Sequence, residues 1–343
     1  MRKDTVMVTG AGGYIGSILV PKLLKNNYKV KAIDRFFFGK DKMTPHPDLK
    51  IIKEDARRLR PDHFTNVDFI IDLVAISNDS SGELFQKETW QINYMSRVNT
   101  AKMAKGFGVK RYILPSSCSI YGFQDKEIIA SEDFSTNPLT TYAKANEKAE
   151  QEILPLASEE FIVTVIRQAT VFGYSPRMRF DLVINGMTYG AFKDKKIPLL
   201  RDGSQFRPLV HIQDTTDVMC LLLEADKEKI NGEIFNVGRN ENNYQLKRLA
   251  EEIRDALPID VKVEWYGDSD KRSFRVNFDK IERILNWKAK WGVREGAKEI
   301  YEKLINGKLE KTEDTITLNW YIELEKWYKI IKEVEMYRGI LKI

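Results

Sequence analysis

Residues 5–16 read TVMVTGAGGYIG. The first five are apolar or β-branched and predict a buried strand, and the glycines that follow predict a tight turn. A helical stretch begins at Ser17, so the order is strand, glycine turn, helix. Such a turn lets the backbone approach a pyrophosphate, which then rests on the amides of the helix N-terminus. The stretch predicts a dinucleotide-binding α/β fold, with Gly10, Gly13 and Gly16 spaced as G-x-x-G-x-x-G.

The alternation of short apolar strands and amphipathic helices continues through the first half of the chain. The strand segments are rich in Val and Ile and lack strict polar alternation, as expected of strands covered on both faces. They are Thr5–Val8, Lys29–Ile33, Leu49–Lys53, Phe69–Leu73, Arg111–Pro115, Phe161–Arg167 and, later, Gly232–Gly238. Helices are predicted at Ser17–Asn26, Gln91–Gly106 and Tyr142–Leu156. This pattern predicts an α/β fold with a doubly wound parallel sheet and right-handed crossovers.

In the second half, shorter elements alternate with loops, which we predict at Pro176–Arg179, Gly203–Pro208 and Asn240–Tyr244. We expect residues 1–173 to form a nucleotide-binding Rossmann domain, to which part of 205–240 returns. Residues 174–311 are expected to form a smaller α/β substrate-binding part, and residues 312–343 a C-terminal helical extension. The aromatic residues of this extension are expected to serve packing or subunit contact rather than a ligand site; they include Trp320, Tyr321, Trp327, Tyr328 and Tyr337.

Composition narrows the class of protein. The 343 residues correspond to one large domain or two fused ones. The net charge of +5 is spread along the chain, so we do not expect nucleic acid as the partner. No apolar run approaches the roughly 20 residues of a membrane span, and no signal peptide is expected. Two cysteines, Cys118 and Cys220, and three scattered histidines predict neither a disulfide framework nor a metal site, and they fit a reducing cytoplasm.

The second predicted strand ends at Asp34. This position is close to the offset of roughly 20 residues at which an acid meets the adenosine ribose of a dinucleotide. The carboxylate can accept hydrogen bonds from both ribose hydroxyls and would repel a 2′-phosphate, which favours NAD over NADP. Arg35 follows immediately and would offset part of this repulsion.

Further segments add to the glycine turn. Residues 111–122 read RYILPSSCSIYG, residues 207–214 read RPLVHIQD, and Tyr142 begins a helical stretch after NPLTT. Together with TGAGGYIG at residues 9–16, they resemble the extended short-chain dehydrogenase/reductase family, whose best-known members are nucleotide-sugar epimerases and dehydratases. The resemblance extends over residues 5–310 or so, and it implies an NAD-dependent enzyme that acts on a nucleotide-diphosphate sugar.

For the cofactor, the resemblance implies contacts from the glycine turn and from the ends of the next strands. Asp55 matches the residue that meets the adenine, Leu73 and Ala75 belong to the segment beside the cofactor, and Asn93 resembles a structural asparagine of the following helix. The implied cofactor residues are Gly10, Gly13, Tyr14, Ile15, Gly16, Asp34, Arg35, Asp55, Ala56, Leu73, Ala75, Asn93, Tyr142 and Asn146.

For the chemistry, the resemblance implies a Ser–Tyr pair. Ser117, four residues before the Tyr of the Tyr121-Gly122 pair, matches the catalytic Ser or Thr, and Tyr142 matches the catalytic Tyr. In this reaction a sugar hydroxyl loses a proton to a base while the adjacent C–H gives a hydride to the nicotinamide. Tyr142 would be the base, and Ser117 would orient the same oxygen. The implied substrate residues are Ser117, Cys118, Ser119, Arg207, which matches an arginine that meets the diphosphate, and Arg272 as a second diphosphate contact.

One position departs from the family pattern. The motif is Tyr-x-x-x-Lys, but Asn146 stands four residues after Tyr142. Lys144 and Lys148 lie about 200° and 240° around the helix from Tyr142, so neither replaces the missing side chain. We expect Asn146 to bond the ribose in place of the lysine. An amide brings no positive charge to lower the phenol pKa, so Tyr142 is expected to need a higher pH to act as a base.

The residue types leave three functions open. Cys118 and Ser119 stand where the dehydratases carry an Asp-Glu pair, which disfavours dehydration, and Asp34 disfavours an NADPH reductase. The first function is an epimerase that oxidises a sugar carbon, expected at C4, and returns the hydride to the opposite face. The second is a dehydrogenase that releases the ketone. The third, favoured only by Asn146, is a catalytically impaired regulatory protein that binds NAD and a nucleotide.

The resemblance also implies an assembly. Family members commonly dimerise through two helices per subunit that pack as a four-helix bundle. Here these helices would be about Gln91–Gly106 and Ala143–Leu156, so a homodimer is expected.

Overall fold

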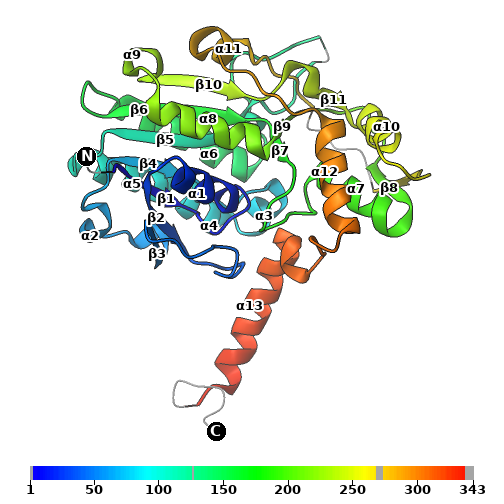
Figure 1. The fold of residues 1–343 in the computed structure, drawn as a ribbon, viewed down its shortest axis with the longest axis horizontal. Coiled ribbons are helices and arrows are strands. Elements are labelled where there is room, and N and C mark those ends of the chain that lie inside the picture. The colour runs from blue at the N-terminus through cyan, green and yellow to red at the C-terminus, as the bar shows by residue number, and fades with distance from the viewer. Residues whose placement is uncertain (1–2, 126, 268–272, 337–343) are drawn as a thin grey trace.

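The fold is built on a parallel sheet (Figure 1). The computed structural model describes residues 3–125, 127–267 and 273–336. Within these residues the central sheet has seven strands in the order β10-β6-β5-β4-β1-β2-β3, and each neighbouring pair is parallel. The strands are β1 (Thr5–Thr9), β2 (Lys29–Asp34), β3 (Leu49–Lys53), β4 (Phe69–Asp72), β5 (Arg111–Ser117), β6 (Ile162–Gln168) and β10 (Glu233–Val237). The predicted doubly wound fold is confirmed.

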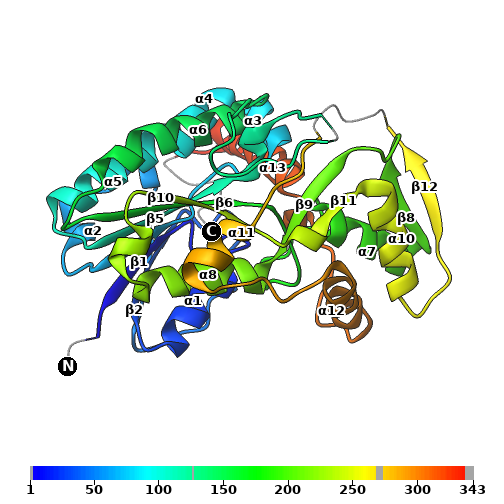
Figure 2. The same cartoon turned by 90° about the horizontal axis from the view of Figure 1, so that it is seen from above.

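Helices cover both faces of this sheet (Figure 2). One face carries α2 (Pro61–Phe64), α3 (Asp79–Leu84), α4 (Gln86–Thr89), α5 (Arg97–Gly106), which continues a wider helical stretch (Trp90–Ser96), and α6 (Thr141–Ile153). The other face carries α1 (Gly16–Lys25), α8 (Ile212–Glu224) and α11 (Asp279–Leu285). Because side chains alternate along a strand, Val6 and Val8 pack in the same core as α1, and Met7 packs in the opposite core with α5 and α6. Both faces are therefore apolar, which explains the lack of alternation in the sequence.

The second half of the chain builds a smaller lobe around its own core. Its strands are β7 (Thr170–Phe172), β8 (Lys196–Leu200), β9 (Phe206–His211), β11 (Asn243–Gln245) and β12 (Lys262–Tyr266), and its helices are α7 (Val183–Asp194), α10 (Leu246–Ala256) and α12 (Val293–Ile305). A short helix, α9 (Lys227–Ile230), precedes β10. Two predicted loops are partly wrong, since Gly203–Pro208 enters β9 and Asn240–Tyr244 enters β11. These strands are too short to show the alternation of apolar and polar residues that marks a strand in a sequence. They form because they pair with each other. The domain boundaries stay a prediction.

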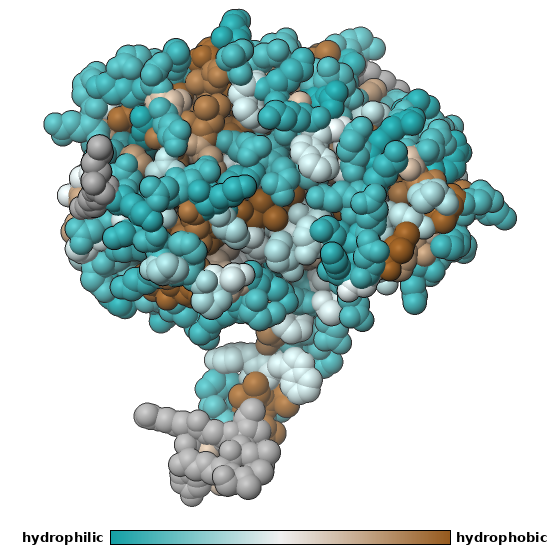
Figure 3. Space-filling model, in the orientation of Figure 1, coloured by the Kyte–Doolittle hydropathy of each residue, from teal (hydrophilic) through white to brown (hydrophobic). Residues whose placement is uncertain are grey.

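The C-terminal helix α13 (Thr317–Val334) projects from the body of the protein (Figures 1 and 3). Its first turns contact the nucleotide-binding half, where Trp320 Nε1 donates to the Phe37 carbonyl at 2.7 Å and the Tyr321 ring packs edge-on against Phe37. Farther along, Trp327 is 55% exposed and Val334 51% exposed. The extension therefore has a packed base and an exposed apolar outer part, and Tyr337 lies outside the described residues.

A buried ion pair fixes α6 to the sheet. Arg167 on β6 donates from Nε and Nη2 to Glu150 Oε2 on α6, at 3.0 and 2.8 Å. The two residues are only 6% and 4% exposed. Because α6 begins beside Tyr142, this pair sets the position of the tyrosine relative to the strand ends.

We predict that Glu150→Ala lowers the free energy of unfolding by about 3–5 kcal/mol, because it leaves the Arg167 guanidinium buried without its counter-ion. Urea denaturation followed by circular dichroism measures the change. Lys148→Ala on the same helix is the control, since the Lys148–Glu152 pair is largely exposed and is expected to contribute less than about 0.5 kcal/mol. Equal effects of the two substitutions would show that the buried pair does not anchor α6.

Candidate active site

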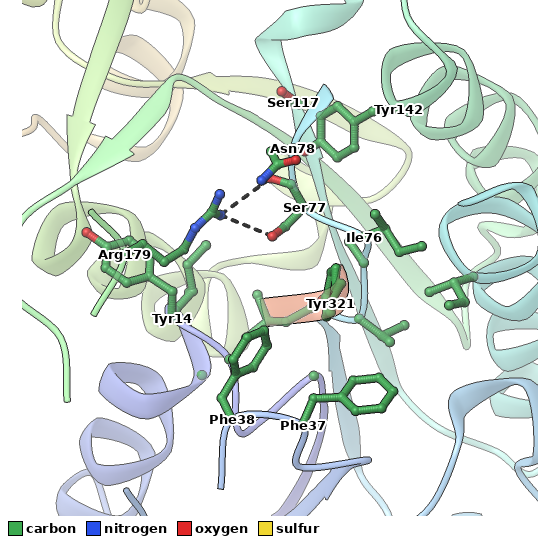
Figure 4. A pocket seen from close by; sticks show the side chains of 18 of the residues that line it. Tyr14, Phe37, Phe38, Ile76, Ser77, Asn78, Ser117, Tyr142, Arg179 and Tyr321 are labelled. Atoms are coloured by element: carbon green, nitrogen blue, oxygen red, sulfur yellow. Dashed lines mark hydrogen bonds between the residues drawn. The ribbon is translucent and has the colours of Figure 1, made fainter. Parts of the chain in front are cut away.

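A cavity of about 680 Å³ opens at the carboxyl ends of the parallel strands. Its walls come from the segments that follow β1, β2, β3, β4 and β5, together with the loop before α7 and the base of α13. This is the edge of a doubly wound sheet at which ligands bind. Figure 4 shows Ser117 and Tyr142 at one end of the cavity and the Phe37, Phe38 and Tyr321 rings at another.

Most residues predicted for the site line this cavity. They are Gly10, Gly13, Tyr14, Ile15, Gly16, Asp34, Arg35, Asp55, Ala56, Leu73, Ala75, Ser117, Cys118, Ser119, Tyr142 and Arg207. Two predicted residues, Asn93 and Asn146, do not line it. Arg272 lies outside the described residues.

The glycine turn forms one wall. Gly10 has φ +65°, and a Cβ there would lie 2.8 Å from the Leu73 carbonyl carbon, so a side chain is excluded. Helix α1 begins at Ile15 without a side-chain cap and has no acidic residue in its first turn. An uncapped helix N-terminus at a cavity wall fits the pyrophosphate of a dinucleotide. The Tyr14 hydroxyl donates to the Gly173 carbonyl at 2.6 Å, which ties the turn to the second half of the chain.

Asp34 lies at the end of β2 and lines the cavity. Its carboxylate accepts from the backbone N–H of Gly12 at 3.0 Å and of Phe36 at 2.6 Å. Burial raises the pKa of Asp34, while these two N–H groups and the Arg177 guanidinium oppose the rise. The carboxylate is therefore held rigidly where the ribose of a dinucleotide is expected.

The charge of Arg35 is engaged by a neighbour. Arg35 pairs with Asp55 at 3.2 Å and stacks over Phe37 at 4.3 Å. Asp55 also pairs with Arg57 at 2.7 Å, and this contact lowers the pKa of Asp55. Because Arg35 is shared with a carboxylate, less of its charge is available to a 2′-phosphate, which agrees with a preference for NAD.

Asn93 supports the wall of the cavity from behind. Its Oδ1 accepts from the Ile76 N–H at 2.8 Å, and its Nδ2 donates to the Ile76 carbonyl at 3.0 Å. Both polar groups of the amide are used on one residue, and the side chain is fully buried. Asn93 thus positions the segment after β4, as the resemblance to a structural asparagine implies, and a direct contact with the cofactor stays a prediction.

Ser117 and Tyr142 meet at the inner end of the cavity (Figure 4). Ser117 ends β5, and Tyr142 lies in the first turn of α6, which Thr140 caps by accepting from the Ala143 N–H at 3.2 Å. Burial raises the pKa of the Tyr142 phenol, and Asp79 raises it further. The hydrogen bond with Ser117 and the guanidinium groups of Arg97 and Arg179 act in the opposite direction.

Asn146 does not take the place of the lysine. Its Nδ2 donates to the Tyr142 carbonyl at 3.0 Å, and its Oδ1 accepts from Arg97 Nη1 at 2.9 Å. The side chain is 2% exposed and turned away from the cavity. The expectation that this amide contacts the ribose is therefore wrong, because a buried arginine holds it in the interior.

The three predicted substrate residues beyond Ser117 differ in what they offer. The Cys118 thiol is buried and donates to the Arg167 carbonyl, so only the backbone of Cys118 faces the cavity. Ser119 belongs to the cavity wall, and its buried hydroxyl has no hydrogen-bond partner among the described residues. Arg207 lines the opposite wall, and its guanidinium lies 5.6 Å from the Phe274 ring centroid.

The sequence analysis missed two cations and an aromatic residue of the cavity. Arg179 pairs with Asp181 at 2.7 Å and donates to the Ser77 hydroxyl at 3.0 Å (Figure 4). Arg177 stacks over Phe38 at 3.6 Å, and burial together with Arg179 lowers the pKa of Arg177 to about 10. These arginines lie in a predicted loop, where no periodicity marks a side chain as buried.

Tyr321 was expected only to pack. It does contact the rings of Phe37, Phe38 and Phe85, but it also lines the cavity. Tyr328, about two turns after Tyr321 on α13, lines the cavity as well. The C-terminal helix is thus part of the cavity wall.

In the part of the chain that the structure describes, no three His, Cys, Asp or Glu side chains lie close enough to hold a metal ion. Over the same residues, no helix is long and apolar enough to span a membrane.

A parallel sheet, a glycine turn that leads into the uncapped helix α1, and an acid at the end of β2 define a dinucleotide-binding α/β protein. The family model of the NAD dependent epimerase/dehydratase family matches residues 6–238, and the chain belongs to this family. It is 27% identical over 307 residues to UDP-glucuronic acid decarboxylase 6 of Arabidopsis thaliana, covering 85% of this chain and 86% of the relative. It is 28% identical over 318 residues to the protein named "Putative UDP-arabinose 4-epimerase 2" of the same organism, covering 83% and 76%.

The fold is similar to that of solved structures. One is UDP-glucuronic acid 4-epimerase from Bacillus cereus in complex with UDP-glucuronic acid and NAD, with a TM-score of 0.78 and 21% identity. The similarity covers 88% of this chain and 99% of that chain. The expected family and the NAD dependence are thus confirmed.

We predict that Asp34→Ala weakens NAD binding by about tenfold or more, because hydrogen bonds to a charged group contribute about 1.5–3 kcal/mol. Binding of NADP should change little, since the repulsive carboxylate disappears together with the ribose acceptor. Isothermal titration with each dinucleotide measures both affinities, and Asp41→Ala, an exposed acid on the next loop, is the control. A wild-type preference for NADP would contradict the role given to Asp34.

Proposed function

We propose that this chain is a 4-epimerase of a UDP-sugar, which oxidises the sugar at C4 and returns the hydride to the opposite face. The observation that carries the proposal is one continuous cavity. It joins the dinucleotide features at Gly13 and Asp34 to the Ser117–Tyr142 pair and to the Arg207 guanidinium. The relative named as a UDP-arabinose 4-epimerase supports this choice of reaction.

Residues of the first half would hold NAD. The amides at the start of α1 suit the pyrophosphate, Asp34 suits the adenosine ribose, and Asp55 with Ala56 lines the expected adenine end. NAD supplies a hydride acceptor that can return the hydride within the same site.

The chain's own groups would move the proton. The Tyr142 phenolate takes the proton of the C4 hydroxyl, and the Ser117 hydroxyl donates a hydrogen bond to the same oxygen. The Arg207 guanidinium suits the substrate diphosphate, which it can bind through two parallel hydrogen bonds. This arrangement would hold the nucleotide part of the substrate while the oxidised sugar turns its opposite face toward the nicotinamide.

A second candidate is decarboxylation, which the relative named as a UDP-glucuronic acid decarboxylase favours. Oxidation at C4 of a uronic acid sugar places a ketone β to the carboxylate, and such acids lose CO2 readily. The Arg177 guanidinium on the cavity wall would suit a sugar carboxylate. Release of the 4-ketone, as by a dehydrogenase, is the outcome if no hydride returns. The retained Ser117 and Tyr142 oppose a purely regulatory role.

The test is turnover by the purified protein with NAD and a panel of UDP-, GDP-, CDP- and dTDP-sugars that includes UDP-glucuronic acid. We expect a C4 epimer of a UDP-sugar by NMR, whereas evolved CO2 identifies the decarboxylase and accumulating NADH the dehydrogenase. Tyr142→Phe should lower the rate by about 10²–10⁴-fold, as loss of an acid–base group does, and leave NAD affinity within about twofold. Tyr266→Phe, an exposed tyrosine of β12, is the control. Retained turnover in Tyr142→Phe would exclude this tyrosine as the base.

We also propose that the protein is a homodimer through the helical face around residues 91–106 and 143–156. Trp90 and Met95 are exposed there, at 36% and 52%. Sedimentation velocity at micromolar concentration should give the mass of a dimer, and Met95→Glu should shift it toward the monomer. Full activity in a wild-type monomer would contradict the proposal.

The two free, buried cysteines suit our further proposal of a reducing, cytoplasmic location.

A further inference from the structure

A buried arginine contacts the side chain that stands in place of the family's lysine. Arg97, the first residue of α5, is 1% exposed. Its guanidinium donates to Asn146 Oδ1 at 2.9 Å, to the Asp72 carbonyl at 3.0 Å and to the Pro115 carbonyl. One cation therefore joins α5, α6 and the ends of β4 and β5, directly behind the inner end of the cavity.

The acceptors of this cation are neutral oxygens. The buried carboxylate of Asp72 accepts instead from the hydroxyls of Thr9 and Tyr112. Arg97 contacts Asp72 through the backbone carbonyl, and within the described residues the Asp72 carboxylate makes no ion pair with the guanidinium. A guanidinium in a dry interior whose hydrogen bonds go to amide oxygens keeps a strong positive potential around it.

Asn146 connects this charge to the tyrosine. Its amide accepts from Arg97 and donates to the carbonyl of Tyr142, so it spans the gap between the guanidinium and the first turn of α6. The charged groups that face the Tyr142 phenol are Asp79 from α3, Arg97 from α5 and Arg179 from the loop before α7. Of the two arginines, Arg179 is neutralised by Asp181 at 2.7 Å.

We propose that Arg97, held by Asn146, is the positioning residue that supplies the positive charge for ionisation of the Tyr142 phenol. It does so from α5, where the family motif uses a lysine one turn along α6. A lysine at position 146 would place an ammonium against the Arg97 guanidinium, and two like charges in a buried site are unfavourable. Asn146 and Arg97 are thus a matched pair, and the missing lysine is not a sign of lost catalysis.

The proposal takes its reaction from the proposed function, but the charge can be tested without turnover. We would label the protein with 3-fluorotyrosine and follow the ¹⁹F NMR signals against pH with NAD bound. The signal that Tyr142→Phe removes belongs to residue 142. Arg97→Met should raise the pKa of this phenol by about 1–3 pKa units, and Arg97→Lys, which keeps the charge, should raise it less.

A double variant separates charge from structure. Arg97→Met with Asn146→Lys returns one positive charge to the neighbourhood of Tyr142 from α6. We expect it to bring the phenol pKa back toward the wild-type value and to restore the pH profile of sugar oxidation. An unchanged Tyr142 titration in folded Arg97→Met would overturn the proposal. So would a double variant that titrates like Arg97→Met, because the arginine would then be merely structural.

If Arg97→Met does not fold by circular dichroism, Arg97→Gln, which keeps hydrogen-bond donors but removes the charge, takes its place in both comparisons. Wild-type protein that turns over no nucleotide sugar would refute the proposed function alone, because the NMR titration still reports whether Arg97 acts on Tyr142.

Discussion

The common direction of the strands is the constraint on which the site depends. Because each strand of the central sheet runs the same way, their carboxyl ends meet at one edge. Gly10, Asp34, Asp55, Leu73 and Ser117 each lie at or just after the end of a different strand, and they come together although more than a hundred residues separate the first from the last. The helices that connect the strands cover the two apolar faces of the sheet and leave this edge open. Each strand end then contributes one side chain or backbone segment to the cavity wall.

Buried cations divide into two kinds in this protein. Arg167 and Arg179 each have a carboxylate within 2.8 Å, so their charge is largely cancelled and they serve to hold elements together. Arg97 has amide and carbonyl oxygens instead, and its charge acts on the groups around it. An ion pair that anchors a helix and a cation that polarises a phenol thus use the same residue type. The difference lies in the partner. It is a carboxylate for Arg167 and Arg179, from α6 and from two residues along the chain, and it is a set of neutral oxygens for Arg97.

The sequence predicts the central sheet well because its strands are buried on both faces. Runs such as Phe69–Leu73 are apolar throughout, and the observed β4 ends within one residue of the predicted strand. Asp34 was predictable for the same reason, since the end of its strand locates it, whereas Asp55, Leu73 and Ser117 were implied by the family resemblance.

Features that depend on tertiary contacts were not predictable. Arg97 lies in an amphipathic helix, where a charged residue normally faces water, and only packing against β4 and β5 shows that it points inward. Asn146 was expected at the ribose because the family resemblance puts it at the position of the motif's lysine, and the arginine that turns its amide away comes from another helix. Tyr321 lies in a tail whose aromatic residues gave no sign of which of them faces the cavity.

The position of Tyr321 has a consequence for how the protein is made. Protein synthesis starts at the N-terminus, so the glycine turn, Asp34, Ser117 and Tyr142 leave the ribosome well before α13 does. The wall that Tyr321 contributes beside Phe37 and Phe38 is missing until the last part of the chain is free to pack. Until α13 packs, the nucleotide-binding half therefore has a more open cleft, because this part of its wall is made after the strand ends that it covers.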